Sequence, residues 1–93
     1  MQAFRVDIDN AEKIVRTMQI IGIKYGPQEL TAPAIAKECA AQFGGLIKGY
    51  DRQVRDMAGP KARRPDKRIQ CSGTDPVLFV LKEWRKKDIH RFG

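Results

Sequence analysis

Three breaks rich in glycine and proline divide the first part of this 93-residue chain into segments of helical length. The breaks are Gly26-Pro27, for which Gly22 is an earlier alternative, Gly44-Gly45 and Gly59-Pro60. Glycine in a left-handed conformation commonly ends a helix, and proline cannot continue one. We therefore predict three short helices in place of one long helix.

The first predicted helix follows a capping residue, Asp9 or Asn10, whose side chain can accept a hydrogen bond from a free backbone amide. Glu12 adds a negative charge in the first turn, where the helix dipole favours it. Apolar residues then recur at i, i+3, i+4 and i+7 and define one buried face: Ala11, Ile14, Val15 and Met18.

The second predicted helix is capped by Thr31 and carries Pro33 in its first turn, where a missing amide costs nothing. Its apolar face consists of Ile35, Ala36, Cys39, Ala40 and Phe43. The third predicted helix runs from about Leu46 to Ala58, and its apolar residues lie within one narrow arc: Ile47, Tyr50, Val54 and Met57.

The remaining segments predict extended structure and loops. Alternating apolar residues from Phe4 to Ile8 are typical of a short half-buried strand, and Val77 to Leu81 is an apolar run of strand length after a Gly73–Pro76 turn. We expect Val77, Phe79 and Leu81 in the core, with Leu78 or Val80. A single domain is predicted, divided into a strand (1–9), a helical region (10–58), a basic loop (59–68), a hairpin (69–84) and a basic tail (85–93) that frays.

The net charge of +7 is unevenly distributed. Met1 to Leu46 holds five basic and five acidic residues, whereas the remainder holds thirteen basic and six acidic residues. The second half therefore carries the whole excess. Such an asymmetry indicates a polyanionic partner, most often nucleic acid and less often a membrane surface.

Several other classes of protein are disfavoured. The longest apolar runs fall far short of the roughly 20 residues of a membrane-spanning helix, the chain start lacks the pattern of a signal peptide, and 42% apolar residues is too many for a disordered tail. Cys39, Cys71 and His90 are too few for a zinc site, so we expect free thiols in a reducing cytoplasm, with no metal and no cofactor.

The predicted order of helix, short helix, glycine-containing turn, amphipathic helix and hairpin resembles the winged helix-turn-helix DNA-binding domains. The resemblance covers about Asn10 to Trp84 and includes Ile35-Ala36, which is similar to the apolar-alanine pair in the first helix of many helix-turn-helix units. It implies an α+β fold, with a three-helix core, a C-terminal β-hairpin and a short N-terminal strand. The chain departs from the pattern at Ala40 to Gly45, which lengthens the usual tight turn.

This resemblance implies that the third helix reads bases in the major groove. Many winged helices also dimerise, and the expected dimer surface here consists of the first helix and residues 4–8. Opposite the apolar arc lie Lys48, Arg52 and Arg55, with Gln53 and Asp51 at the flanks. The loop is expected to contact phosphates or to act as a minor-groove arm. The predicted DNA-binding cations of the loop are Lys61, Arg63, Arg64, Lys67 and Arg68. We expect them to form one continuous face with the cations of the third helix. The predicted function is sequence-specific binding of duplex DNA, favoured over RNA, by a small transcriptional or replication-type regulator without catalysis.

Two other functions stay open at this point. The basic tail with His90 also resembles small ribonuclease toxins of toxin-antitoxin pairs, in which His90 would act as general acid or base and neighbouring cations would stabilise phosphate charge: Arg85, Lys86, Lys87 and Arg91. A non-catalytic regulator that binds and blocks an acidic partner protein fits the same charge. Trp84 is expected to seal the edge of the core, with stacking on a base as the alternative.

Overall fold

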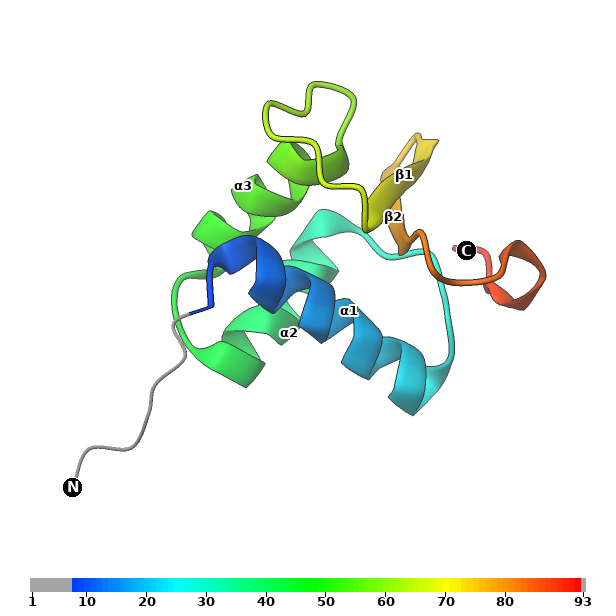
Figure 1. Cartoon of the computed structure of the whole chain (residues 1–93), viewed down its shortest axis with the longest axis horizontal. Coiled ribbons are helices and arrows are strands. Elements are labelled where there is room, and N and C mark those ends of the chain that lie inside the picture. The colour runs from blue at the N-terminus through cyan, green and yellow to red at the C-terminus, as the bar shows by residue number, and fades with distance from the viewer. Residues whose placement is uncertain (1–7, 93) are drawn as a thin grey trace.

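The computed structural model describes residues 8–92 and has an α+β architecture (Figure 1). Three helices are followed by a two-stranded antiparallel sheet and a short 3-10 helix, which confirms the predicted fold class and element order. The predicted strand at residues 1–9 lies outside the described residues except for Ile8 and Asp9, which are not in a strand. The elements are α1 (Asn10–Tyr25), α2 (Ala32–Phe43), α3 (Ile47–Ala58), β1 (Ile69–Thr74), β2 (Val77–Leu81) and η1 (Lys86–Asp88).

Local capping determines where the helices begin and end. The side chains of Asp9 and Thr31 accept hydrogen bonds from the backbone amides three residues later, at 2.8 and 3.3 Å. Gly26 and Gly44 follow the last residues of α1 and α2 with φ angles of 87° and 75°, a conformation that glycine adopts without strain. Gly26 therefore ends α1, and Gly22 lies inside it.

The core contains the apolar residues predicted from helical spacing, with one exception. Ile14 and Met18 of α1, Ile35 of α2, and Val54 of α3 are fully buried. Ile47 is 47% exposed, so its predicted place on the buried arc is wrong. This residue is the first of α3, where the helix has not yet entered the core. In the sheet, Val77 is partly buried and Leu78 through Leu81 are all buried.

Trp84 closes one edge of the core, as predicted. Its side chain is partly buried against the core cluster, and a Cβ atom built on Gly22 would lie 3.0 Å from the indole ring. Glycine at position 22 therefore lets the tryptophan approach α1 closely, which explains a glycine inside a helix.

The link between α2 and α3 consists of residues 44–46, since α2 ends at Phe43 and α3 begins at Ile47, close to the predicted bounds. Residues 40–43, predicted to lengthen the turn relative to the helix-turn-helix pattern, extend α2 instead. The hydroxyl of Tyr50 donates a hydrogen bond of 2.6 Å to the carbonyl oxygen of Gly44. This bond ties the turn to the first half of α3.

The linker between α1 and α2 pairs with the hairpin, a contact that the sequence did not predict. The amide of Leu30 donates to the carbonyl of Phe79 at 3.0 Å, and the amide of Phe79 donates to the carbonyl of Leu30 at 2.7 Å. β1 pairs with β2 antiparallel, with an irregularity between Cys71 and Gly73. The hairpin is thereby attached to the helices through backbone bonds as well as through its buried face.

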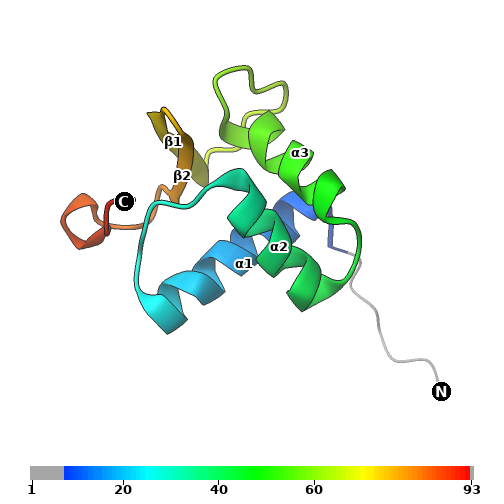
Figure 2. The same cartoon turned by 180° about the vertical axis from the view of Figure 1, so that it is seen from behind.

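The tail also bonds to this linker, so the prediction that it frays is not supported. The amide of His90 donates to the carbonyl of Pro27 at 2.9 Å, and the amide of Glu29 donates to the carbonyl of His90 at 3.0 Å. A third bond runs from the amide of Phe92 to Glu29 Oε1 at 2.9 Å. Figure 2 shows the tail on the side of the hairpin away from α3. Over residues 8–92, no helix has the length and apolar character needed to cross a membrane.

Candidate nucleic-acid interface

The two faces of α3 differ sharply in chemistry. Tyr50, Val54 and Met57 are buried against the other helices. Lys48 and Arg52 are exposed, as the sequence predicted. Gln53, predicted at the flank, is partly buried. The amphipathic spacing of this helix therefore presents cations to solvent while its apolar residues hold it in place.

One cation of this face is held in a defined orientation. Arg55 Nε lies 2.6 Å from Asp51 Oδ1, one helical turn earlier, and the two side chains are 51% and 26% exposed. An acidic residue four positions before a basic one is a favourable arrangement on a helix. The sequence placed Asp51 at the flank, but it did not predict this ion pair.

The basic loop folds back over the C-terminal end of α3. The amide of Arg64 donates to the carbonyl of Asp56 at 3.0 Å, and the amide of Asp66 donates to the carbonyl of Met57 at 2.9 Å. These bonds use carbonyl groups of the last turn, which lack partners within the helix. The loop is thus a folded part of the domain and not a free connector.

A pocket of about 410 Å³ forms where α3, the loop and the hairpin meet. Arg52 and Arg55 line it from the helix, Lys61 and Arg63 line it from the loop, and Asp56 is the acidic residue among them. We call it the α3–loop pocket; its remaining lining residues are Gly59, Pro60 and Val77. Four of the predicted DNA-binding cations therefore border one space.

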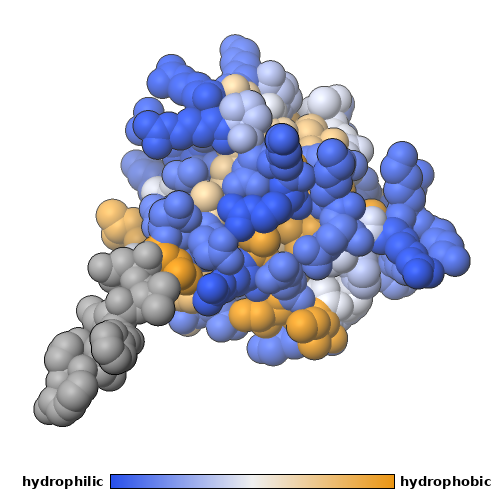
Figure 3. Space-filling view, in the orientation of Figure 1, coloured by the Kyte–Doolittle hydropathy of each residue, from blue (hydrophilic) through white to orange (hydrophobic). Residues whose placement is uncertain are grey.

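A second pocket continues this surface along α3. It is lined by Ile47, Lys48, Asp51, Arg52 and Arg55, and shares both arginines with the α3–loop pocket. We call it the α3 surface pocket. Figure 3 shows hydrophilic side chains gathered over α3 and the loop. Exposed Arg64 and Lys67 line neither pocket.

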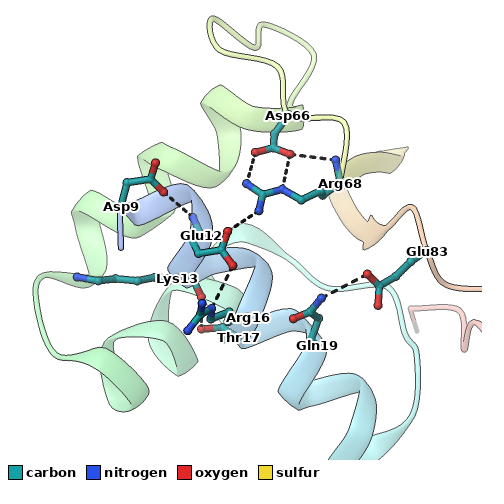
Figure 4. Close-up of polar contacts among 9 residues, drawn as sticks. All are labelled: Asp9, Glu12, Lys13, Arg16, Thr17, Gln19, Asp66, Arg68 and Glu83. Atoms are coloured by element: carbon teal, nitrogen blue, oxygen red, sulfur yellow. Dashed lines mark hydrogen bonds and ion pairs between the residues drawn. The ribbon is translucent and has the colours of Figure 1, made fainter. Parts of the chain in front are cut away.

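Arg68, the last predicted DNA-binding residue, is engaged in contacts within the protein (Figure 4). Its guanidinium contacts Asp66 through Nε and Nη2 at 3.0 and 2.8 Å, and contacts Glu12 of α1 through Nη1 at 2.6 Å. Glu12 also accepts a hydrogen bond from Arg16 at 3.0 Å. A contact of Arg68 with DNA stays a prediction, whereas its role as a link between α1 and the loop is part of the fold.

These contacts change the acidity of the groups involved. Hydrogen bonds from Arg68 are the main reason why the pKa values of Glu12 and Asp66 lie below their ordinary range. The two carboxylates in turn raise the pKa of Arg68. All three groups are therefore charged at neutral pH, and the positive charge of Arg68 is offset locally.

The tail brings together a different set of side chains. Exposed His90 does not line the nearby pocket of about 260 Å³, whose charged lining residues are Glu29, Lys86 and Arg91. Arg85 and Lys87 are exposed beside this segment. The residues of the predicted ribonuclease site are thus near one another in the chain, but His90 lies outside the cation-lined pocket.

The two cysteines are free thiols, and burial raises the pKa of the Cys39 thiol. Within the part of the chain that the structure describes, no group of three or more His, Cys, Asp or Glu residues is placed to hold a metal ion. Cys39 is buried in the core, and Cys71 is partly buried.

Comparisons with protein-family models, with curated proteins and with solved structures return no match for this chain.

Proposed function

We propose that this protein binds duplex DNA sequence-specifically, as a small transcriptional or replication-type regulator of the winged helix-turn-helix kind. In this proposal the outer face of α3 enters the major groove and the loop contacts phosphates. No catalytic step is included. The observation that carries the proposal is the α3–loop pocket, in which Arg52, Arg55, Lys61 and Arg63 converge from two separate segments.

Convergence matters because it separates a binding surface from incidental charge. A helix of about 12 Å diameter fits the major groove of duplex DNA, whose width is about 12 Å. Cations beside such a helix then lie near the phosphates that border the groove. The loop supplies cations at this position, since its backbone is bonded to the last turn of α3 through Asp56 and Met57.

The attachment of the hairpin supports the same arrangement. Phe79 pairs with Leu30 just before α2, so the hairpin stays at a fixed place beside the α2–α3 unit. Val77 of this hairpin borders the α3–loop pocket. Helix, loop and hairpin can therefore meet a duplex as one body, without ordering of separate parts on binding.

Duplex DNA fits this surface better than duplex RNA. The major groove of A-form RNA is too deep and narrow for side chains to read. Arginine can bridge two acceptors on guanine in the wide major groove of DNA, and can also bind phosphate. Binding is expected to weaken steeply with salt, because each neutralised phosphate releases condensed counterions.

The direct test is selection of bound duplexes from a random pool at moderate salt. We expect an enriched sequence, and an affinity for it that falls with rising salt. The double substitution Arg52→Ala plus Arg55→Ala is expected to abolish the preference for the selected sequence over random DNA. Fluorescence anisotropy on both duplexes measures this ratio.

The matched control is Lys24→Ala plus Lys87→Ala. It removes the same charge from exposed positions on α1 and η1, away from α3 in Figure 1. This variant is expected to keep the sequence preference. Failure to enrich any duplex would refute the proposed function. Undiminished discrimination by the Arg52/Arg55 variant would show that α3 does not read bases.

A further inference from the structure

The α3 surface pocket contains two features that the predicted set of DNA-binding residues does not include. One is an exposed apolar side chain, Ile47, and the other is the carboxylate of Asp51, which holds Arg55. Ile47, Asp51 and Arg55 are spaced at i, i+4 and i+8, so they form one stripe along the helix.

Ile47 is 47% exposed, and the residues that line the α3 surface pocket with it are all charged. Lys48 and Arg52 border the same pocket, which makes its surroundings favourable for a polyanion. The one apolar group that DNA presents in its major groove is the methyl group of thymine. The first residues of a reading helix are the ones that approach base edges.

Asp51 determines where the guanidinium of Arg55 points. Its Oδ1 atom lies 2.6 Å from Nε, the inner nitrogen of the guanidinium, and no other hydrogen bond of this side chain occurs within residues 8–92. The two outer nitrogens remain available as a pair. Such a pair matches the O6 and N7 acceptors of guanine.

The spacing of these two groups along α3 can be compared with the spacing of bases in DNA. Helical side chains lean toward the N-terminus, so the guanidinium of Arg55 lies beside the turn of Asp51, one turn from Ile47. One turn spans about 5.4 Å, whereas successive bases of one strand are about 3.4 Å apart. A thymine and a guanine one or two steps apart would fit this spacing.

We infer that the stripe Ile47–Asp51–Arg55 is the base-reading part of α3: Ile47 contacts a thymine methyl group, and Arg55, positioned by Asp51, binds a guanine. This inference rests on the proposed function and names its sequence determinants. Asp51 is a positioning residue here, since it acts on DNA only through Arg55.

The test for Ile47 removes a single methyl group from the selected duplex by replacing thymine with deoxyuridine, one position at a time. At one position we expect the affinity of the parent protein to fall about three- to fourfold, the effect of one buried methyl group. The Ile47→Ala variant is expected to bind the thymine and deoxyuridine duplexes equally. Circular dichroism checks that α3 is retained, and alanine favours helix.

The test for Asp51 compares Asp51→Asn with Asp56→Asn, which removes the same charge from the same helix without touching an Arg55 contact. Both variants are expected to bind random DNA more tightly, because a negative charge near phosphates is lost. At one position of the selected duplex, the parent protein is expected to bind guanine about tenfold or more tightly than 7-deazaguanine. Only Asp51→Asn is expected to lose this difference in affinity.

The outcomes separate the inference from the proposed function. A selected duplex whose affinity is indifferent to deoxyuridine and to 7-deazaguanine at every position would overturn the inference alone. Equal loss of discrimination in Asp51→Asn and Asp56→Asn would overturn the positioning role of Asp51. If no duplex is enriched from the pool, both the proposed function and the inference fail.

Discussion

The loop after α3 and the C-terminal tail are both rich in cations and are built into the fold in different ways. Residues 59–68 hold five lysines and arginines, and residues 85–93 hold four. The loop bonds to the last turn of α3, so two of its cations join two arginines of the helix around one pocket. The tail bonds to the α1–α2 linker, where its pocket includes Glu29.

The difference teaches that two segments with similar local charge density can have very different surroundings in the fold. What distinguishes the loop is the element beside it, an exposed helix face whose cations face the same space. The tail is next to a linker that offers a carboxylate and backbone groups. The comparison between these two regions therefore yields tests in which charge is kept equal and position is varied.

The largest effect is expected from Phe79→Ala, which weakens the attachment shared by both regions. Phe79 is fully buried, and its backbone pairs with Leu30. Removing a buried phenylalanine side chain typically costs about 3–5 kcal/mol of unfolding free energy. Chemical denaturation followed by circular dichroism measures this loss; a cost below about 1 kcal/mol would show that the hairpin is not part of the core.

The next largest effect separates the two regions directly. Lys61→Ala plus Arg63→Ala is expected to lower the affinity for the selected duplex about tenfold or more, and to reduce the slope of log affinity against log salt by about 2. Lys86→Ala plus Lys87→Ala removes the same charge from the tail and is expected to leave both quantities nearly unchanged. Salt titrations by fluorescence anisotropy provide the measurement, and equal effects of the two pairs would remove the distinction between loop and tail.

Much of the scaffold around these regions was predictable because its signals are local. Thr31 caps α2 through its own side chain, Gly26 and Gly44 end helices by their own φ angles, and the buried face of α3 follows from spacing within 12 residues. Arg52 on the outer face follows from the same spacing. Such features need no knowledge of distant residues.

The features that sequence reasoning missed depend on contacts between distant segments. Residues 28–30 are too short for an alternating pattern, so the Leu30–Phe79 pairing left no strand signal. The exposure of Ile47 depends on which turns of α3 pack against the other helices, and the buried residues of this helix begin at Tyr50. Arg68 looks like its neighbouring cations until its contact with Glu12, 56 positions away, is known.

A smaller effect, on thermal stability, is expected from Arg68→Ala, and its size should depend on pH. Because Arg68 lowers the pKa values of Glu12 and Asp66, the network stabilises the fold above the ordinary values of 4.5 and 3.8. This contribution is lost as the pH falls through the lower pKa values of the folded state. Arg68→Ala is therefore expected to lower Tm modestly at neutral pH and progressively less as the pH falls through the lowered pKa values of the two carboxyl groups.

The control for this network is Arg64→Ala, which removes an exposed arginine of the same loop. Its effect on Tm should not depend on pH in this way. If Arg68→Ala lowers Tm equally at neutral and acidic pH, the contacts with Glu12 and Asp66 do not stabilise the fold. A loss of DNA affinity at unchanged Tm would instead assign Arg68 to the binding surface with its neighbours.

The smallest effect is expected at His90, where the ribonuclease alternative places its general acid or base. The contacts of His90 with Pro27 and Glu29 use its backbone, which alanine retains, and its side chain is exposed. His90→Ala is therefore expected to leave Tm and DNA affinity unchanged, and we expect neither protein to cleave single-stranded RNA. Cleavage by the parent protein that is absent in the variant would reverse the comparison, because the tail and not the loop would then be the functional end of the molecule.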